Sequence, residues 1–282
     1  MATAISARTD AAGADAGKGA DTRLRDSIAA GQFEVPMLSR AAGEVIALCS
    51  GDGVDARALA LKIQQDPALA AEVLRIANCA SFAGGSPVVS LQQAIARMGL
   101  DRIREIALAI ALKSDLFRSR DQEARLRAVW RDAVAAAAWA REVARACRVN
   151  AEMAYLGGLL HNIGIPVLLR TVERLGIVLD EAALAHALDA HAAAAGVALV
   201  RRWSLPPQVA AVIRDHRSEA CDDVTVKIVA TAIWLIGVDP DADAASLIGA
   251  PEFGRVNLYP EDVERLWRGR EKVAQLVDAL AL

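Results

Sequence analysis

The chain has 282 residues and a formal net charge of −3; 54% of its residues are hydrophobic, 24% are charged and only 4% are aromatic. This balance is ordinary for a globular protein and excludes a global basic field that would attract nucleic acid or an anionic membrane surface. Because aromatic residues are scarce, the core must consist mainly of Ala, Leu, Val and Ile. An Ala- and Leu-rich composition favours helices.

The N-terminal segment, the apolar stretches and the cysteines indicate the compartment. Residues 1–22 are small and polar without periodicity, so we expect a disordered leader that lacks the apolar core of a secretory signal. The longest apolar stretches, such as residues 228–238, are too short to span a bilayer. We expect a cytoplasmic protein that does not contact a membrane. The four cysteines form no CxxC pair or metal-finger spacing and are expected to be buried, reduced thiols: Cys49, Cys79, Cys147 and Cys221.

Helix start and stop signals are legible in the first half of the chain. Asp66 precedes a proline, the pattern of an N-cap followed by the residue preferred at the first helical position, and a helix over residues 68–78 follows. Ser90 is expected to cap a short helix that Gly99 ends. Asp101 is expected to cap the next helix. These signals predict a series of short helices.

The second half of the chain is also helical in pattern. No segment shows sustained alternation with β-branched enrichment, so no sheet is expected. The expected helices cover about residues 127–146, 153–161, 172–178, 182–200, 206–216, 222–236 and 260–280. The fold class is therefore predicted to be all-α.

Three histidines have the most informative settings for chemistry: His161, His191 and His216. Neutral imidazoles are good ligands for transition metals. Taken alone, a histidine on an apolar helix is more typical of a packed core residue than of a ligand. The sequence around each histidine is therefore needed to weigh a shared site.

The sequence around His161 resembles a known signature. Residues 159–164 read Leu-Leu-His-Asn-Ile-Gly, which is similar to the LLHDIG signature of the HD phosphohydrolase superfamily, with Asn162 in place of the aspartate. Further strings, in the same order, resemble the HDOD branch of that superfamily: residues 63–69, 74–80, 87–95, 98–103, 191–196, 203–206 and 212–217. The resemblance covers about residues 33–235, and the ordered set of strings makes it specific.

The resemblance implies an architecture as well as a family. An N-terminal helical bundle is expected to pack on a degenerate HD-type helical bundle. The expected division of the chain is a leader over 1–22, an N-terminal helical subdomain over 23–124, a degenerate HD-like subdomain over 125–236 and a C-terminal helical extension over 237–282.

The resemblance also implies a metal site, and this sequence departs from it. HD enzymes bind divalent metals through an upstream histidine, the His-Asp pair and a later aspartate. Here His161 is present, Asn162 replaces the aspartate, no histidine precedes His161, and residues 230–232 contain no acid where the later aspartate is implied. A cation in an apolar pocket needs carboxylates to balance its charge. We therefore expect no catalytic residue, no bound metal and no cofactor.

The vestigial motif, His161 and Asn162, still outlines a place for a ligand or partner. The expected pocket consists of Asp132, His161, Asn162, His191 and His216. The alternative is a divalent metal held by three imidazoles and a water, a geometry known for zinc. That alternative requires His161, His191 and His216 to converge on one point.

Three functions are left open by these residues. The first is a non-catalytic bacterial signal-transduction module that binds other signalling proteins. The second is a metal-dependent phosphohydrolase or phosphodiesterase with an unusual histidine site. The third is a sensor that binds a cyclic dinucleotide or another nucleotide without chemistry. Net charge and aromatic content argue against nucleic-acid binding.

Overall fold

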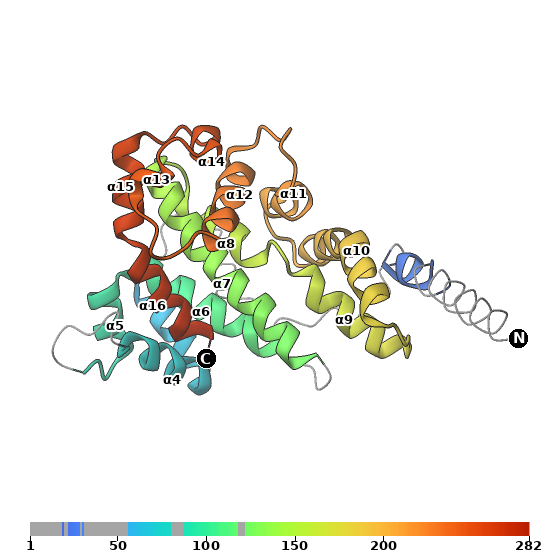
Figure 1. Ribbon diagram of the computed structural model, residues 1–282. Helices are drawn as coiled ribbons and strands as arrows, with labels where there is room; N and C mark the ends of the chain where they lie inside the picture. The colour runs from blue at the N-terminus through green and yellow to red at the C-terminus, as the bar shows by residue number, and fades with distance from the viewer. Residues whose placement is uncertain are drawn as a thin grey trace, which may run out of the picture.

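A computed structural model describes residues 22–28, 56–79, 87–117 and 122–281, together with Gly19 and Ala30. Across these residues every regular element is a helix and none is a strand, so the all-α prediction is confirmed (Figure 1). Residues 22–28 are helical. The helices that follow are, in chain order, α3 (Ala56–Gln64), α4 (Pro67–Ala77), α5 (Leu91–Met98), α6 (Leu100–Leu116), α7 (Glu123–Ala146), α8 (Ala151–Leu160), α9 (Gly164–Leu175), α10 (Glu181–Arg202), α11 (Pro207–Asp215), α12 (Val224–Ile236), α13 (Ala244–Leu247), α14 (Pro251–Arg255), α15 (Pro260–Arg268) and α16 (Arg270–Ala281).

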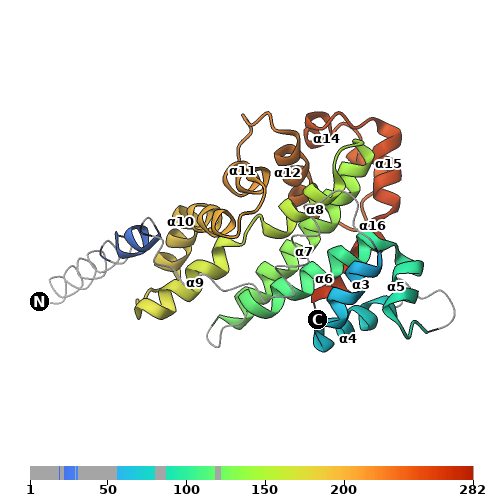
Figure 2. The same cartoon turned by 180° about the vertical axis from the view of Figure 1, so that it is seen from behind.

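The Ala-rich helix α7 forms the centre of the fold. It packs against α8, α12, α15 and α16, and two opposite views show it running through the middle of the molecule (Figure 1, Figure 2). Small side chains let these helices approach closely. A Cβ added to Gly158 of α8 would lie 2.7 Å from the Ala136 oxygen and from the Ala137 Cα of α7. Only glycine fits at that contact, because real Cβ atoms do not approach backbone so closely.

Helices α9 and α10 meet at a second close approach. A Cβ added to Gly164, the first residue of α9, would lie 1.7 Å from the carbonyl oxygen of Ala192 on α10. Gly196 faces the same contact, since a Cβ there would lie 3.2 Å from the Gly164 nitrogen. This contact fixes the short turn between α8 and α9.

The C-terminal helix α16 lies against the first half of the chain. It packs on α6 and α7. The Trp130 Nε1 group of α7 donates to the Leu280 carbonyl oxygen at 3.0 Å, and Lys113 Nζ of α6 donates to the same oxygen at 3.2 Å. Arg75 Nη2 of α4 donates to the Ala279 oxygen at 2.8 Å. The end of the described chain is thus tied to three earlier helices.

Two of the predicted N-caps are confirmed and one is wrong. The side chains of Asp66 and Ser90 accept hydrogen bonds from backbone amides of the following turn, at 3.0 and 3.2 Å. Helix α6 instead follows Gly99, whose φ of 85° favours glycine and which offers no side-chain cap. Asp101 lies inside the first turn of α6 and pairs with Arg104 at 2.9 Å. An ion pair therefore replaces the predicted cap.

Several predicted boundaries are also wrong. Helix α7 begins at Glu123 rather than near residue 127, and the helix expected over 172–178 is the end of α9, which begins at Gly164. The single helix expected over 260–280 is divided into α15 and α16 at Gly269. The short helices α13 and α14 were not predicted. The expected leader over 1–22 falls almost entirely outside the described residues.

Two helical segments are long and apolar enough to cross a membrane by length and composition alone, so the prediction that every apolar stretch is too short is wrong. The segment Ala151–Leu175 contains α8 and α9, and 78% of its most apolar window is buried inside the fold. The segment Glu181–Arg202 is α10, and 33% of its most apolar window is buried. Burial in the helical core accounts for the first segment, and most of the apolar residues of α10 are alanines.

The cysteines in the described residues are free thiols. Cys79, Cys147 and Cys221 are half-buried rather than fully buried, and Cys49 lies outside the described residues. Cys147 Sγ lies 3.4 Å from the Val256 carbonyl oxygen. Burial, with a smaller contribution from nearby Asp262, raises the pKa of the Cys147 thiol to about 11, so this thiol stays protonated at neutral pH.

Candidate functional site

His161 follows the last residue of α8 and is buried in the core. Its Nδ1 atom lies 2.7 Å from the Gly158 carbonyl oxygen, which can only accept, so Nδ1 carries the proton and Nε2 keeps its lone pair. The pKa of His161 is lowered to about 4, mainly by burial and to a smaller extent by His216 and Arg217, while the hydrogen bond to Gly158 opposes the change. The ring is therefore neutral at neutral pH.

His216 follows the last residue of α11 and meets His161 edge to face. The two ring centroids are 5.4 Å apart, with an interplanar angle of 83°. Nδ1 of His216 donates to the Val212 carbonyl oxygen at 2.9 Å, and burial lowers the pKa of this ring too. The fold thus brings together two of the three predicted histidines as neutral imidazoles.

Asn162 occupies the position of the HD aspartate. Its Nδ2 group donates to the Val129 carbonyl oxygen of α7 at 3.1 Å. Its Oδ1 atom is buried and has no hydrogen-bond partner among the described residues. The amide therefore ties the α8–α9 turn to α7, a contact that an ionised carboxylate could not donate.

The other two predicted pocket residues contribute less. Asp132 lies one turn beyond Val129 on α7 and is exposed, and it makes no ion pair with a described residue. Partial desolvation raises the pKa of Asp132, opposed by Arg131. His191 lies half-buried on α10. In the part of the chain that the structure describes, no three His, Cys, Asp or Glu side chains lie close enough to hold one metal ion.

These residues do not fit the metal centre that the HD resemblance implies. The donors at the motif are two neutral imidazoles and one amide oxygen. No carboxylate of the described residues joins them, and Thr231, where the later aspartate is implied, donates instead to the Lys227 and Glu252 carbonyl oxygens, at 3.0 and 3.2 Å. A divalent cation there would be buried without a balancing negative charge.

Comparison with known proteins identifies the family. The HDOD domain matches residues 35–219, which is more than half of the chain. The chain belongs to the HDOD domain family. The predicted membership is confirmed, and helices α12 to α16 follow the matched residues of the HDOD domain.

Relatives of this HDOD protein include one curated sequence and several solved structures. An uncharacterized protein from Treponema pallidum (strain Nichols) is 27% identical over an alignment of 209 positions that covers 70% of this chain; the chain spans only 40% of that protein's length. A crystal structure from Shewanella amazonensis SB2B, provisionally named a metal-dependent phosphohydrolase, has a TM-score of 0.70 and 20% identity, covering 94% of this chain and 99% of that one. A crystal structure from Marinobacter aquaeolei VT8, provisionally named a signal transduction protein, has a TM-score of 0.65 and 23% identity. The match covers 96% of this chain and 66% of that one. At these identities the structures establish the shared fold.

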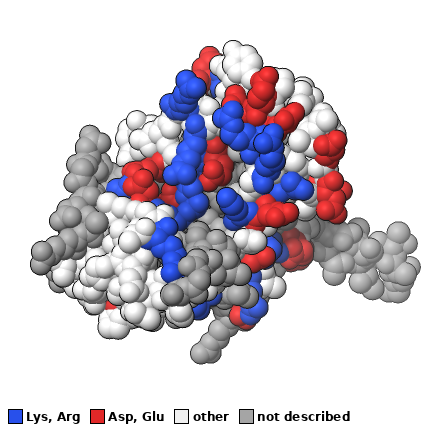
Figure 3. Space-filling model, turned by 90° about the vertical axis from the view of Figure 1, so that its left-hand side faces the viewer, with Lys and Arg blue, Asp and Glu red and all other residues white. Residues whose placement is uncertain are grey.

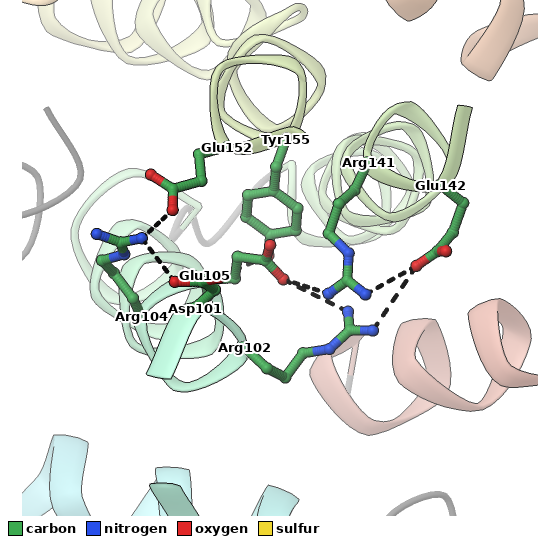
Figure 4. Close-up of polar contacts among 8 residues, drawn as sticks. All are labelled: Asp101, Arg102, Arg104, Glu105, Arg141, Glu142, Glu152 and Tyr155. Carbon is green, nitrogen blue, oxygen red and sulfur yellow. Dashed lines mark hydrogen bonds and ion pairs between the residues drawn. The ribbon is translucent and has the colours of Figure 1, made fainter. Parts of the chain in front are cut away.

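The HDOD protein also contains a buried network of charges between α6 and α7 (Figure 4). Glu105 of α6 accepts from Arg141 Nη1 of α7 at 2.8 Å and pairs with Arg102 at 3.4 Å. Arg141 Nη2 donates to Glu142 at 2.8 Å, and Tyr155 of α8 donates to the Glu105 backbone oxygen at 3.2 Å. Glu105 thus joins three helices, with its carboxylate bound to α7 and its backbone oxygen bound to α8.

A second branch of the network surrounds Arg104, which is also buried. This guanidinium pairs with Asp101 of its own helix and with Glu152 of α8 (Figure 4). Burial raises the pKa of Glu152, and the charge of Arg104 opposes that rise. Pairing and burial together make this branch a structural link between α6 and α8.

The electrostatics of the network are set by burial. Burial raises the pKa of Glu105, although the guanidiniums of Arg141 and Arg102 oppose the rise. Burial is the main cause that lowers the pKa of Arg102, and repulsion from Arg141 lowers it further. Glu142 also pairs with Arg102, at 3.8 Å, so Glu105 and Glu142 together balance the charges of Arg102 and Arg141.

Sequence reasoning missed this network. A signal was present, because Arg102 and Glu105 interrupt the apolar residues of α6, and Arg141 and Glu142 interrupt the Ala-rich run of α7. Charged residues within a predicted core helix are rarely buried unless they are paired. Nothing in the sequence indicated which of these residues would face one another.

Proposed function

We propose that this chain is a non-catalytic regulatory module that acts by binding other signalling proteins or a small ligand. One observation carries the proposal: Asn162 stands where an HD enzyme has its metal-binding aspartate, and its amide donates to the Val129 backbone at 3.1 Å. The residue serves as a structural contact between α7 and the α8–α9 turn.

The surrounding chemistry supports the same proposal. Activation of water for phosphoester hydrolysis by this fold needs a cation whose charge is partly neutralised by its ligands. His161 and His216 supply two neutral rings, each with Nδ1 bonded to a helical carbonyl oxygen. Membership of the HDOD family and the fold shared with a protein provisionally named for signal transduction are consistent with a regulatory role.

The test is a hydrolysis assay on the purified full chain with Mg²⁺, Mn²⁺ or Fe²⁺. The substrates are bis(p-nitrophenyl) phosphate and cyclic dinucleotides. We expect no turnover above a no-enzyme control. The matched variants are Asn162→Asp, which restores the motif's acid, and His161→Ala. Turnover by the unaltered chain that disappears in His161→Ala would contradict the proposal, whereas activity confined to Asn162→Asp would support it.

The second candidate is a metal-dependent phosphohydrolase with a histidine-based site. It is favoured by the adjacent rings of His161 and His216 and by the unpartnered Oδ1 of Asn162. Elemental analysis of the purified protein separates the two functions. A stoichiometric transition metal that is lost in His216→Ala would favour the hydrolase, and metal-free protein would favour the regulatory module.

A further inference from the structure

The outward side of the buried charge network forms one wall of a cavity. This cavity has a volume of about 490 Å³ and lies between α6, α7, α15 and α16. Its volume falls in the range of sites that take small molecules and cofactors. It lies apart from the histidine motif, since none of the motif residues lines it.

Positive side chains dominate the lining of this cavity. Five cations line it: Arg102, Arg141, Arg145, Arg265 and Lys272. They come from α6, α7, α15 and α16 and therefore converge from four helices. Apolar side chains such as Ala138, Leu266 and Val273 form the rest of the surface.

Acidic side chains balance only part of this charge. Glu142 and Asp262 line the cavity, and both are paired: Glu142 with Arg141 at 2.8 Å, and Asp262 with Arg265 at 3.4 Å. Counting the buried Glu105 as well, the five cations exceed the three acids by two charges. An anion entering the cavity would meet this excess.

The individual side chains also have free capacity to bind an anion. Arg141 is 4% exposed, and its Nε group is buried with no hydrogen-bond partner among the described residues. Arg145 and Lys272 are exposed at the mouth, and neither side chain forms a hydrogen bond or ion pair with another described residue. A buried donor without a partner is costly, and this guanidinium forms part of the cavity wall.

The surrounding surface favours a small anion over a polymer. Figure 3 shows Lys and Arg side chains gathered in a column on the face that carries α15, with acidic side chains on both sides of it. Flanking acids would repel the continuous phosphate backbone of a nucleic acid. No aromatic side chain lines the cavity, so the stacking platform typical of single-strand binding is missing there.

We propose that the cavity between α6, α7, α15 and α16 binds a small molecule that carries two or more phosphate groups, with Arg145, Arg265 and Lys272 at its mouth and Arg141 at its base. Guanidinium groups suit this ligand because they can form paired hydrogen bonds with phosphate oxygens. The inference deepens the proposed function by giving the module a ligand site, and it rests on that function only in treating the ligand as a signal.

The test is calorimetric titration of the full chain with inorganic tripolyphosphate, with ATP in a second arm and with a single-stranded oligonucleotide in a third. The variant is Arg145→Ala with Lys272→Ala, since both side chains are exposed and neither forms a hydrogen bond or ion pair with another described residue. The matched control is Arg201→Ala with Arg202→Ala, which removes the same charge from exposed positions of α10. Thermal unfolding of each ligand-free variant checks that the fold is intact.

We expect tripolyphosphate to bind the unaltered chain, the cavity variant to bind about tenfold more weakly or worse, and the control to change by less than about twofold. Tighter binding of ATP would assign the ligand to the nucleotides, and equal binding would assign it to oligophosphates in general. The proposal would be overturned if tripolyphosphate did not bind the unaltered chain, or if the cavity variant and the control lost affinity equally. Tighter binding of a single-stranded oligonucleotide that the cavity variant loses would also overturn it. None of these results depends on hydrolysis. Failure of the cavity to bind the ligand would therefore leave the hydrolysis assay, and the proposed function that it tests, unaffected.

Discussion

Arg141 of α7 donates from Nη1 to Oε2 of Glu105 on α6 at 2.8 Å, and both side chains are almost fully buried. The two residues are 36 positions apart in the chain. Their pairing joins the helix that crosses the centre of the fold to the N-terminal helices. It also places the Arg141 guanidinium at the base of the cationic cavity.

Arg141→Met is expected to lower the free energy of unfolding by about 3–5 kcal/mol at pH 7, because it leaves the buried Glu105 carboxylate without its principal partner. Urea unfolding measures the loss. Arg145→Met, one turn further along α7 and exposed, is the control and should change stability little. Adding Glu105→Leu to Arg141→Met should recover most of the loss. A double variant no more stable than Arg141→Met would contradict this account of the pair.

The buried histidine predicts a definite loss of stability in acid. His161 has a folded pKa of about 4 against an ordinary value of 6.5. Below pH 6.5 His161 is protonated in the unfolded chain but stays neutral in the folded chain. The contribution of neutral His161 to the stability of the fold is therefore complete above pH 6.5 and is lost as the pH falls toward 4. The total loss from this residue is about 3 kcal/mol. His216, whose pKa burial also lowers, adds in the same direction.

The measurement is the free energy of unfolding in urea at a series of pH values across this window. His161→Asn keeps a donor near the Gly158 oxygen but cannot take up a proton. Its stability should therefore depend less steeply on pH than that of the unaltered chain. His186→Asn removes an exposed histidine of α10 and should leave the slope in place. Equal slopes in all three proteins would show that His161 is not the group responsible.

The close approach of α9 and α10 predicts an intolerant glycine. Gly164→Ala would place a Cβ 1.7 Å from the Ala192 oxygen, so the two helices must separate, at a cost of about 3 kcal/mol or more. Gly254→Ala in α14 is the control, since a Cβ there meets nothing within 4 Å. Thermal unfolding should show a large decrease in Tm for the first variant only. Similar Tm values for both variants would exclude the predicted clash.

Two tryptophans separate the effect of a hydrogen bond from that of ring size. Trp130 Nε1 donates to the Leu280 oxygen at 3.0 Å, whereas Trp203 Nε1 is buried without a partner among the described residues. Both Trp→Phe changes shorten the ring, but only Trp130→Phe breaks a hydrogen bond. We expect Trp130→Phe to cost about 2 kcal/mol more than Trp203→Phe in chemical unfolding. A larger cost for Trp203→Phe would refute the assignment.

The amino-acid sequence by itself determined the all-α class, two N-caps and the substitution at the HD motif. These are local properties: helix propensity and capping depend on neighbouring residues, and Asn162 is neutral whatever surrounds it. The boundaries of α7 and α9 were predicted less well, because packing against α8 and α10 extends both helices beyond their local signals. The HDOD family was predicted from ordered strings and is confirmed.

Only the tertiary structure decided which distant residues meet. His161 and His216 face each other because α8 and α11 pack side by side, and the pairing of Arg141 with Glu105 depends on how α6 lies against the central helix. The cationic cavity likewise exists only where α15 and α16 close over α7. Helix periodicity fixes the face on which a side chain lies, but the neighbour of that face depends on packing between segments far apart in the chain.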